Sequence, residues 1–213
     1  MARGKPVRLL VRNAAALGDH LRHPLVRVVV GSLGNAAALE SAIAGSEAIV
    51  HLASGGGDSY EDFERTIVAG SVAVADLCGK HGVKRLVYTS SVAALYFGGR
   101  RPITDATPPD SRPLARSHYA RAKIESERRL LALHRGDGAA GRDPAPRRRG
   151  RRARAAVPHG VGQWPRDTHC LGWGSGNVVI PFVLAGDVAD AVVLALERRG
   201  SRGARSTSPA MSG

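Results

Sequence analysis

Short apolar runs alternate with segments of helical periodicity from Val7 to Ser91, and this alternation constrains the fold more than any other feature of the sequence. The apolar runs predict strands at residues 7–11, 26–30, 48–53 and 85–91. Helices are predicted at 36–44, which Gly45 closes, and at 60–80, where the apolar positions lie largely on one side. Strands that alternate with helices are typical of a parallel sheet covered by helices. We therefore expect an α/β fold.

The stretch HYARAKIESERRLL, residues 118–131, predicts an amphipathic helix because apolar residues recur near helical spacing while charged residues occupy the remaining face. Tyr119 and Lys123 are four residues apart, so they are expected to point the same way. An ammonium beside a phenol favours the phenolate and lowers a pKa that starts near ~10. Such a pair could exchange a proton with a substrate, although the same spacing also occurs by coincidence on helix surfaces.

Two further hydroxyls lie where a parallel sheet carries its reactive groups. Ser90 and Ser91 end the strand predicted at 85–91, and the proline-rich loop TDATPPDSRP then leads to the helix of Tyr119. Open α/β sheets bind ligands outside the carboxyl ends of their strands. Both serines are therefore candidate site residues.

The composition excludes several other classes of protein. A chain of 213 residues that is 43% hydrophobic can bury one substantial core. No apolar run approaches the ~20 residues that cross a bilayer, and the first residues lack a signal-peptide pattern, so a cytoplasmic location is expected. Cys78 and Cys170 cannot form a disulfide framework, and His159 and His169 match no zinc spacing. We expect no metal site.

Nearly half of the net charge of +13 lies in one segment. Eight arginines and two aspartates lie between Arg135 and Arg154, in a segment whose glycines and prolines show no periodicity. Arginines can bind nucleic-acid phosphates without regard to sequence, but the segment has no aromatic residue to stack on bases, so specific recognition is not expected. One hypothesis is that residues 137–160 are an out-of-frame reading of a valine-rich strand, because GTC codons shifted by one base encode arginine.

The motif VYTSS at 87–91, followed by YARAK at 119–123, is similar to the serine, tyrosine and lysine set of the extended short-chain dehydrogenase/reductase family, the NAD-dependent epimerase/dehydratase group. Other pieces of the sequence follow in the order of that family, namely LLVRN (9–13), GSL (31–33), AIVHLAS (48–54) and FVLAGDVADAVVLALE (182–197). The resemblance implies a Rossmann-like, doubly wound parallel sheet. It also implies hydride chemistry with NAD or NADP at a carbinol or carbonyl carbon of a small molecule. Sugar nucleotides, steroid-like and flavonol-like compounds are the substrate classes left open.

The resemblance implies a role for each catalytic residue. Tyr119 would exchange a proton with the substrate oxygen. Lys123 would hold the nicotinamide ribose hydroxyls and keep the phenol acidic. Ser91, as the last residue of the Thr-Ser-Ser group, would donate a hydrogen bond to the developing oxyanion, in preference to Ser90.

The same resemblance implies cofactor contacts at the strand ends. Besides Tyr119 and Lys123, these involve Ser32, Leu33, Leu52, Ala53 and Ser54. Arg12 stands where the family has an acidic residue on the adenosine ribose, and an arginine there accommodates a 2′-phosphate, which favours NADP over NAD. An ordinary solvated charge at Arg12 is the alternative.

The sequence also departs from the family pattern. The family opens with a glycine-rich turn, G-x-x-G-x-x-G, that cradles the pyrophosphate, and no such motif precedes the first predicted strand. We therefore expect a sheet truncated at its N-terminal strand and helix. Ser32 replaces a usual aspartate and Ile67 a usual asparagine. A degenerate, inactive family member that does not hold the cofactor is the alternative function.

Four parts are predicted along the chain. Residues 1–134 form a partial dinucleotide-binding domain with the catalytic motif, and residues 135–160 form an irregular segment. Residues 161–199 are the remnant of a C-terminal strand and helix, in which 180–184 is the strand and Asp187 caps the helix. Residues 200–213 are a disordered tail. Because family members commonly pair through the tyrosine-bearing helix and the preceding long helix, the resemblance also implies a homodimer as one assembly.

Overall fold

The computed structural model describes residues 4–95, 103–104, 106–136, 163–166, 169–171 and 183–197. The chain divides into two compact units, residues 1–140 and 141–213, and each is described by itself. The arginine-rich stretch from residue 137 and the tail from residue 200 lie outside the described residues, as does the hypothesis of an out-of-frame reading.

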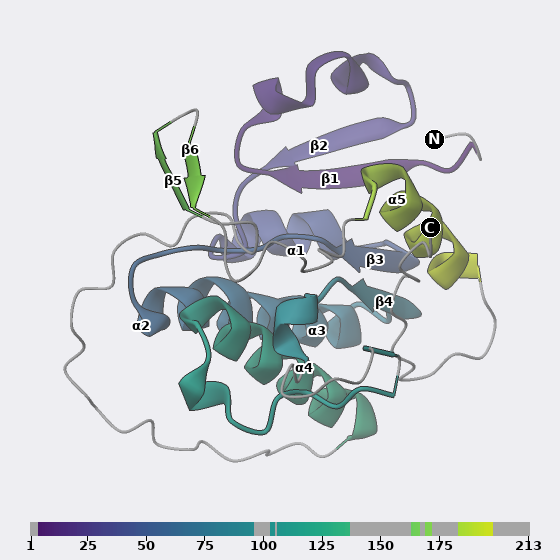
Figure 1. Cartoon of the computed structure of the whole chain (residues 1–213). Helices are drawn as coiled ribbons and strands as arrows, with labels where there is room; N and C mark the ends of the chain where they lie inside the picture. The colour runs from purple at the N-terminus through teal and green to yellow at the C-terminus, as the bar shows by residue number, and fades with distance from the viewer. Residues whose placement is uncertain are drawn as a thin grey trace. The chain divides into compact units, whose positions relative to one another are not determined.

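Two pairs of parallel strands form the sheet elements of the first unit (Figure 1). β1 (Val7–Val11) pairs in parallel with β2 (Val26–Val30), and β3 (Ala48–His51) pairs in parallel with β4 (Arg85–Tyr88). The first two strands have the limits predicted from the sequence. β3 and β4 end two and three residues earlier than predicted, because the residues that follow them leave the ladder and form the loops of the candidate site.

Helical segments connect these strands. They are η1 (Ala14–Arg22), α1 (Ala36–Ile43), the consecutive α2 (Tyr60–Phe63), η2 (Glu64–Ala69) and α3 (Gly70–Lys80), the short η3 (Val92–Ala94) and η4 (Pro113–Ala115), and α4 (His118–Arg135). The predicted helices at 36–44, 60–80 and 118–131 are therefore present. η1 was not predicted; it consists of short 3-10 turns interrupted at Gly18, whose φ of 51° is not helical.

Polar caps fix where the main helices begin. The Asn35 side chain accepts a hydrogen bond from the amide of Ala38 at the start of α1, and the Ser117 hydroxyl accepts one from Ala120 at the start of α4. Ser59 and Asp62 form a reciprocal capping box at the start of α2. Gly136, with φ of 77°, takes the left-handed conformation that ends α4.

The middle of the helix predicted at 60–80 differs from a regular α-helix. η2 is a π-helix, in which each turn holds more residues than an α-turn. Its buried residues Ile67 and Val68 pack against Ala122 of α4, with Tyr119 also in contact. π-helical turns are frequent at functional sites, and this one lies beside the predicted catalytic tyrosine.

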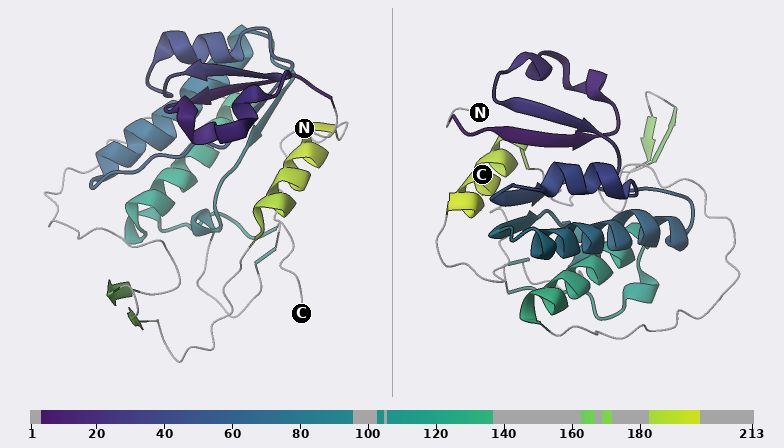
Figure 2. Two further views of the ribbon diagram at one scale, coloured as in Figure 1. Left: turned by 90° about the horizontal axis from the view of Figure 1, so that it is seen from above. Right: turned by 180° about the vertical axis from the view of Figure 1, so that it is seen from behind.

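The main core of the first unit lies between the strands and two helices. Leu39 and Ile43 of α1 and Val74 and Cys78 of α3 form its buried centre. Side chains from three strands pack against that centre, namely Leu10, Ile49 and Leu86. α3 in turn lies beside α4, as two views show (Figures 1 and 2). This order of packing brings α4 and its Tyr-Lys pair next to the strand region.

The described part of the second unit comprises an antiparallel pair, β5 (Gln163–Arg166) with β6 (His169–Leu171), and the helix α5 (Ala185–Glu197). The helix begins two residues before Asp187, so this carboxylate lies in the first turn and is not the cap predicted from the sequence. It still faces the positive end of the helix dipole. Among the helices that the structure describes, none has the length and apolarity needed to cross a membrane.

Candidate active site

Loops that follow two different strands meet at one stretch of helix, residues 66–70. A Cβ atom added to Gly70 would lie 2.9 Å from Cδ1 of Leu33, which follows β2. A Cβ added to Gly55, which follows β3, would lie 2.0 Å from Oγ1 of Thr66. The carboxyl ends of β2 and β3 therefore lie against neighbouring turns of the same helix, as expected for a ligand-binding edge of an α/β sheet.

Lys123 points from α4 toward the carboxyl end of β4. Its residue is only 2% exposed, and Nζ donates hydrogen bonds to the carbonyl oxygen of Thr89 at 3.1 Å and to the hydroxyl of Tyr88 at 3.4 Å. Burial lowers the pKa of Lys123, and the nearby carboxylate of Glu127 opposes that shift. An ammonium has three N–H donors, and these two contacts use two of them.

Tyr119 lies on the same side of α4, one turn before the lysine. The ammonium of Lys123 is 5.9 Å from the centre of the Tyr119 ring. The ring also makes an edge contact with Phe63, at 6.3 Å between ring centres. The predicted pair therefore shares one face of the helix.

Ser91 and Ser90 have different surroundings. The Ser91 hydroxyl oxygen accepts a hydrogen bond from the amide of Ala93 and caps η3, which leaves its own O–H able to donate. The hydroxyl of Ser90 is buried and has no hydrogen-bond partner among the described residues. The Ser91 geometry suits the donor role predicted from the sequence.

Lys123 contacts a buried network of polar side chains that the sequence did not predict. The imidazole Nε2 of His51 lies 3.0 Å from the Ser71 hydroxyl, and the Tyr88 hydroxyl lies 2.7 Å from that of Ser126. Ser126 donates to the carbonyl of Lys123 at 3.1 Å. Because an ammonium can only donate, the Tyr88 hydroxyl accepts from Lys123, and its own proton can be donated to Ser126.

His51 is held neutral in this network. Burial lowers its pKa to about 4, and the positive charge of Lys123 contributes to the shift. Its ring lies 5.4 Å, between centres, from that of Tyr88, its partner on the neighbouring strand. Burial likewise raises the pKa of the Tyr88 phenol. At neutral pH, Lys123 is thus surrounded by uncharged donors and acceptors on the strand side.

Apart from Tyr119 and Lys123 of α4, the predicted cofactor residues follow the ends of strands. Arg12 follows β1, Ser32 and Leu33 follow β2, and Leu52, Ala53 and Ser54 follow β3. Most of them are exposed, and Leu52 is 60% exposed although it is apolar. Leu33 is half-buried and packs against the core of α1 and α3. Exposed strand-end residues of this kind are available to a ligand, whereas Leu33 also has a packing role.

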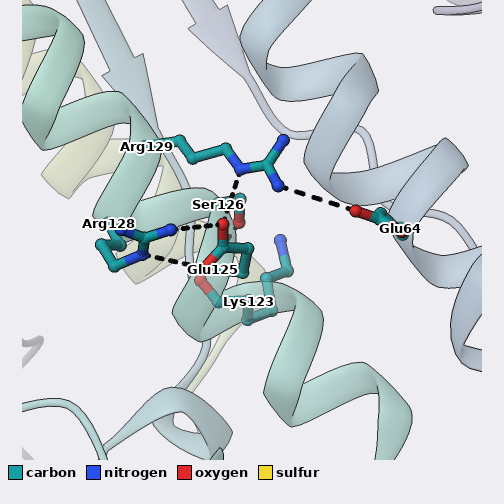
Figure 3. Close-up of polar contacts among 6 residues, drawn as sticks. All are labelled: Glu64, Lys123, Glu125, Ser126, Arg128 and Arg129. Atoms are coloured by element: carbon teal, nitrogen blue, oxygen red, sulfur yellow. Dashed lines mark hydrogen bonds and ion pairs between the residues drawn. The ribbon is translucent and has the colours of Figure 1, made fainter. Parts of the chain in front are cut away.

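Ion pairs run along α4, and one of them reaches η2 (Figure 3). The Glu125 carboxylate accepts from Arg128 at 2.9 Å and from Arg129 at 2.6 Å, and Arg129 also reaches Glu64 at 3.6 Å. Arg129 and Glu64 are 36% and 44% exposed, and ion pairs this accessible stabilise by well under about 1 kcal/mol each.

Comparison with known proteins assigns the family. The profile of the NAD dependent epimerase/dehydratase family matches residues 1–205. The chain belongs to this family. Short-chain dehydrogenase/reductase family 42E member 1 of Bos taurus is 31% identical over 127 residues, which are 53% of this chain and 32% of that protein. The resemblance inferred from the VYTSS and YARAK motifs is thereby confirmed.

Solved structures of the family share the fold. The dTDP-glucose 4,6-dehydratase of Streptomyces venezuelae, solved with NAD bound, is 27% identical with a TM-score of 0.53, covering 63% of this chain and 44% of its own. The UDP-glucose 4-epimerase of Bifidobacterium longum, solved with NAD⁺ and UDP, is 21% identical with a TM-score of 0.53, covering 63% and 43%. The predicted Rossmann-like α/β class is confirmed. The chain spans less than half the length of either enzyme.

The residues present suit one side of a nicotinamide nucleotide. Lys123 retains an N–H donor beyond its contacts with Tyr88 and Thr89, which fits a ribose hydroxyl. Ser91 retains a hydroxyl proton for a substrate oxygen. The nicotinamide end of such a ligand is therefore the part that the described residues fit.

Proposed function

We propose that the chain is an NAD(P)-dependent oxidoreductase or epimerase/dehydratase that acts on a carbinol or carbonyl carbon. The observation that carries this proposal is the placement of Lys123, a buried ammonium at the carboxyl end of β4 on the same helix face as Tyr119. Membership of the NAD dependent epimerase/dehydratase family supports it.

In the proposed mechanism each residue handles a proton or a charge. Tyr119 gives its phenolic proton to, or takes one from, the substrate oxygen. Lys123 donates to the nicotinamide ribose hydroxyls. Ser91 donates a hydrogen bond to the oxygen on which negative charge develops. A bound nicotinamide would supply or accept the hydride at the adjacent carbon.

The substrate class we propose to test first is the sugar nucleotides. The Streptomyces venezuelae dehydratase, which is 27% identical to this chain, is named for dTDP-glucose. A hydroxysteroid and a flavonol-like ketone complete the panel, because the described residues do not discriminate among these shapes. The binding of NADP in preference to NAD remains a prediction that rests on Arg12.

The test combines cofactor titration with turnover. Purified full-length protein is titrated with NADPH and NADH by fluorescence and then assayed on the panel. Tyr119→Phe is expected to keep cofactor binding and lose about 100-fold or more of the turnover. Lys123→Met is expected to lose both. Lys84→Met is the control. Lys84 is exposed and lies between α3 and β4, so the variant should match the wild type.

A second candidate is a family member that does not hold the cofactor, and the departures from the family pattern at Ser32 and Ile67 favour it. In that case neither NADPH nor NADH gives saturable fluorescence changes at millimolar concentration. Saturable binding supports the first candidate, and its absence supports the second. The homodimer stays a prediction that analytical ultracentrifugation of the same preparation tests. Filter binding at rising salt tests for sequence-independent affinity to nucleic acid.

A further inference from the structure

Two segments that carry candidate catalytic residues are joined by a partly buried ion pair. Asp110, 6% exposed, accepts a hydrogen bond from the guanidinium of Arg116 at 3.0 Å between Oδ2 and Nη1. The other terminal nitrogen of Arg116 donates to the carbonyl of Ala93 at 3.2 Å, across 23 residues of sequence. We refer to Asp110 and Arg116 together as the 110/116 pair.

The 110/116 pair fixes the loop after β4. Besides the contact of Arg116 with Ala93, the amide of Asp110 donates to the carbonyl of Ala94 at 3.0 Å. Leu95, 3% exposed, forms an antiparallel bridge with Pro109. These three contacts lie within four residues of Ser91, so that they hold the end of η3, whose first turn Ser91 caps.

The same pair fixes the entry to α4. Arg116 is followed directly by Ser117, whose hydroxyl caps the helix, and Tyr119 is the second residue of that helix. The second carboxylate oxygen of Asp110, Oδ1, accepts a hydrogen bond from the amide of Arg112 at 2.9 Å. This bond stabilises the loop between Asp110 and Arg116. One arginine thus links the backbone beside Ser91 to the backbone beside Tyr119.

On this basis we propose that Arg116 and Asp110 are positioning residues that hold Ser91 and Tyr119 in one arrangement around the substrate oxygen. The inference rests on the proposed function, because it assigns the pair a part in that reaction. Neither residue need touch the substrate. A misplacement of about 1 Å between reacting groups can lower a rate about 100-fold, so a clamp between these two segments has a direct catalytic effect.

The experiment measures kinetics and backbone protection in the same variants of the full chain. Arg116→Ala is expected to lower kcat by roughly 10- to 100-fold while the cofactor dissociation constant stays within about twofold. Arg116→Lys should recover part of the loss, because a lysine can pair with Asp110 but lacks the planar fork needed to reach Ala93 as well. Arg112→Ala is the matched control, since its exposed side chain belongs to the same loop, and it should leave kcat unchanged.

Amide hydrogen exchange gives a readout that does not depend on turnover. In Arg116→Ala, the amides of Ala94 and Leu95, which bond to Ser91 and Val92, and that of Arg121 should exchange faster than in the wild type. Amides of α1 should exchange as before. If Arg116→Ala does not fold, Asp110→Asn serves, because it keeps the volume and the contact with Arg112 but removes the charge.

The outcomes separate this proposal from the proposed function. If the wild type turns over and the variants match it in kcat or in exchange, the positioning proposal is overturned while the proposed function stands. If the wild type binds no cofactor and turns over no substrate, the proposed function fails. Exchange then decides alone: faster exchange on both segments supports the clamp, and unchanged exchange on either segment overturns it.

Discussion

The ammonium of Lys123 donates a hydrogen bond to the main-chain carbonyl of Thr89, 3.1 Å away at the carboxyl end of β4. A long lysine side chain is thereby held in one direction by a backbone atom that no substitution at residue 89 can remove. Its other partner is the Tyr88 hydroxyl, so the buried charge rests on uncharged acceptors. Removing one of these acceptors should destabilise the fold, because the buried ammonium would keep its full desolvation cost with fewer hydrogen bonds to offset it.

The first prediction concerns the Tyr88 hydroxyl. Tyr88→Phe removes an acceptor from Lys123 and a partner from Ser126, and we expect it to lower the free energy of unfolding by about 1–3 kcal/mol. Cofactor affinity should fall with it, because Lys123 is then less fixed. Urea denaturation and cofactor titration measure the two effects.

Tyr60→Phe provides the control for that experiment. Its ring packs under the Arg121 guanidinium at 3.5 Å, while its hydroxyl makes no hydrogen bond within the part of the chain that the structure describes. The loss of this hydroxyl should change the free energy of unfolding by less than about 0.5 kcal/mol. Equal destabilisation by the two variants would contradict the network as the source of the Tyr88 effect.

The second prediction follows from the neutral His51. Its pKa is about 4 in the folded chain, below the ordinary value of 6.5, so the unfolded chain takes up the proton first as pH falls. The stability that the neutral His51 contributes to the folded chain is therefore fully present above pH 6.5 and is lost as pH falls toward 4. At 1.36 kcal/mol per pKa unit, the loss is about 3 kcal/mol.

His51→Gln is the matched variant, since its side-chain amide can still donate to Ser71 but does not titrate. Subtracting its unfolding free energy from that of the wild type at each pH removes the contributions of all other groups. The difference should decline by about 3 kcal/mol between pH 6.5 and 4. A difference that stays constant over this window would show that His51 is not buried in its neutral form.

The repeating parts of the fold could be predicted from the sequence. β1 and β2 have the predicted limits because their apolar runs stay in the ladder to the last residue. β3 and β4 are shorter because periodicity cannot tell a strand residue from the first loop residue when both are apolar or hydroxylated, as at Leu52 and Ser90. The π-helical turn of η2 leaves the apolar pattern almost unchanged, so the pattern could not indicate it.

The candidate site divides in the same way. The four-residue spacing of Tyr119 and Lys123 predicts that both lie on the same face of a helix, whatever elements that helix packs against. Contacts that join separate elements, such as His51 with Ser71, depend on how the elements pack, and one sequence carries no signal for that pairing. The 110/116 pair lies in irregular backbone, where no period exists from which a neighbour could be inferred.

The third prediction tests the choice between NADP and NAD. Arg12 is exposed directly after β1 and makes no ion pair among the described residues, so its guanidinium can bind a 2′-phosphate. Arg12→Ala should weaken NADPH binding about tenfold, which is about 1.4 kcal/mol, and leave NADH within about twofold. Arg27→Ala, an exposed arginine on β2, is the control. Equal weakening of both cofactors would assign Arg12 no role in discrimination.

The fourth prediction tests whether the loop after β3 meets the helix at Thr66. Ala at position 55 would place its Cβ 2.0 Å from Oγ1 and 2.2 Å from Cβ of Thr66, whereas Ala at position 56 would meet nothing within 4 Å. Gly55→Ala should therefore destabilise by about 1–3 kcal/mol through overpacking. Gly56→Ala should be neutral or stabilise by up to about 1 kcal/mol, because it restricts the unfolded chain. Urea denaturation of both variants is the measurement. Since the two glycines are adjacent and undergo the same substitution, opposite effects can arise only from what each faces, and a loss of stability at position 56 equal to that at 55 would place the loop away from Thr66.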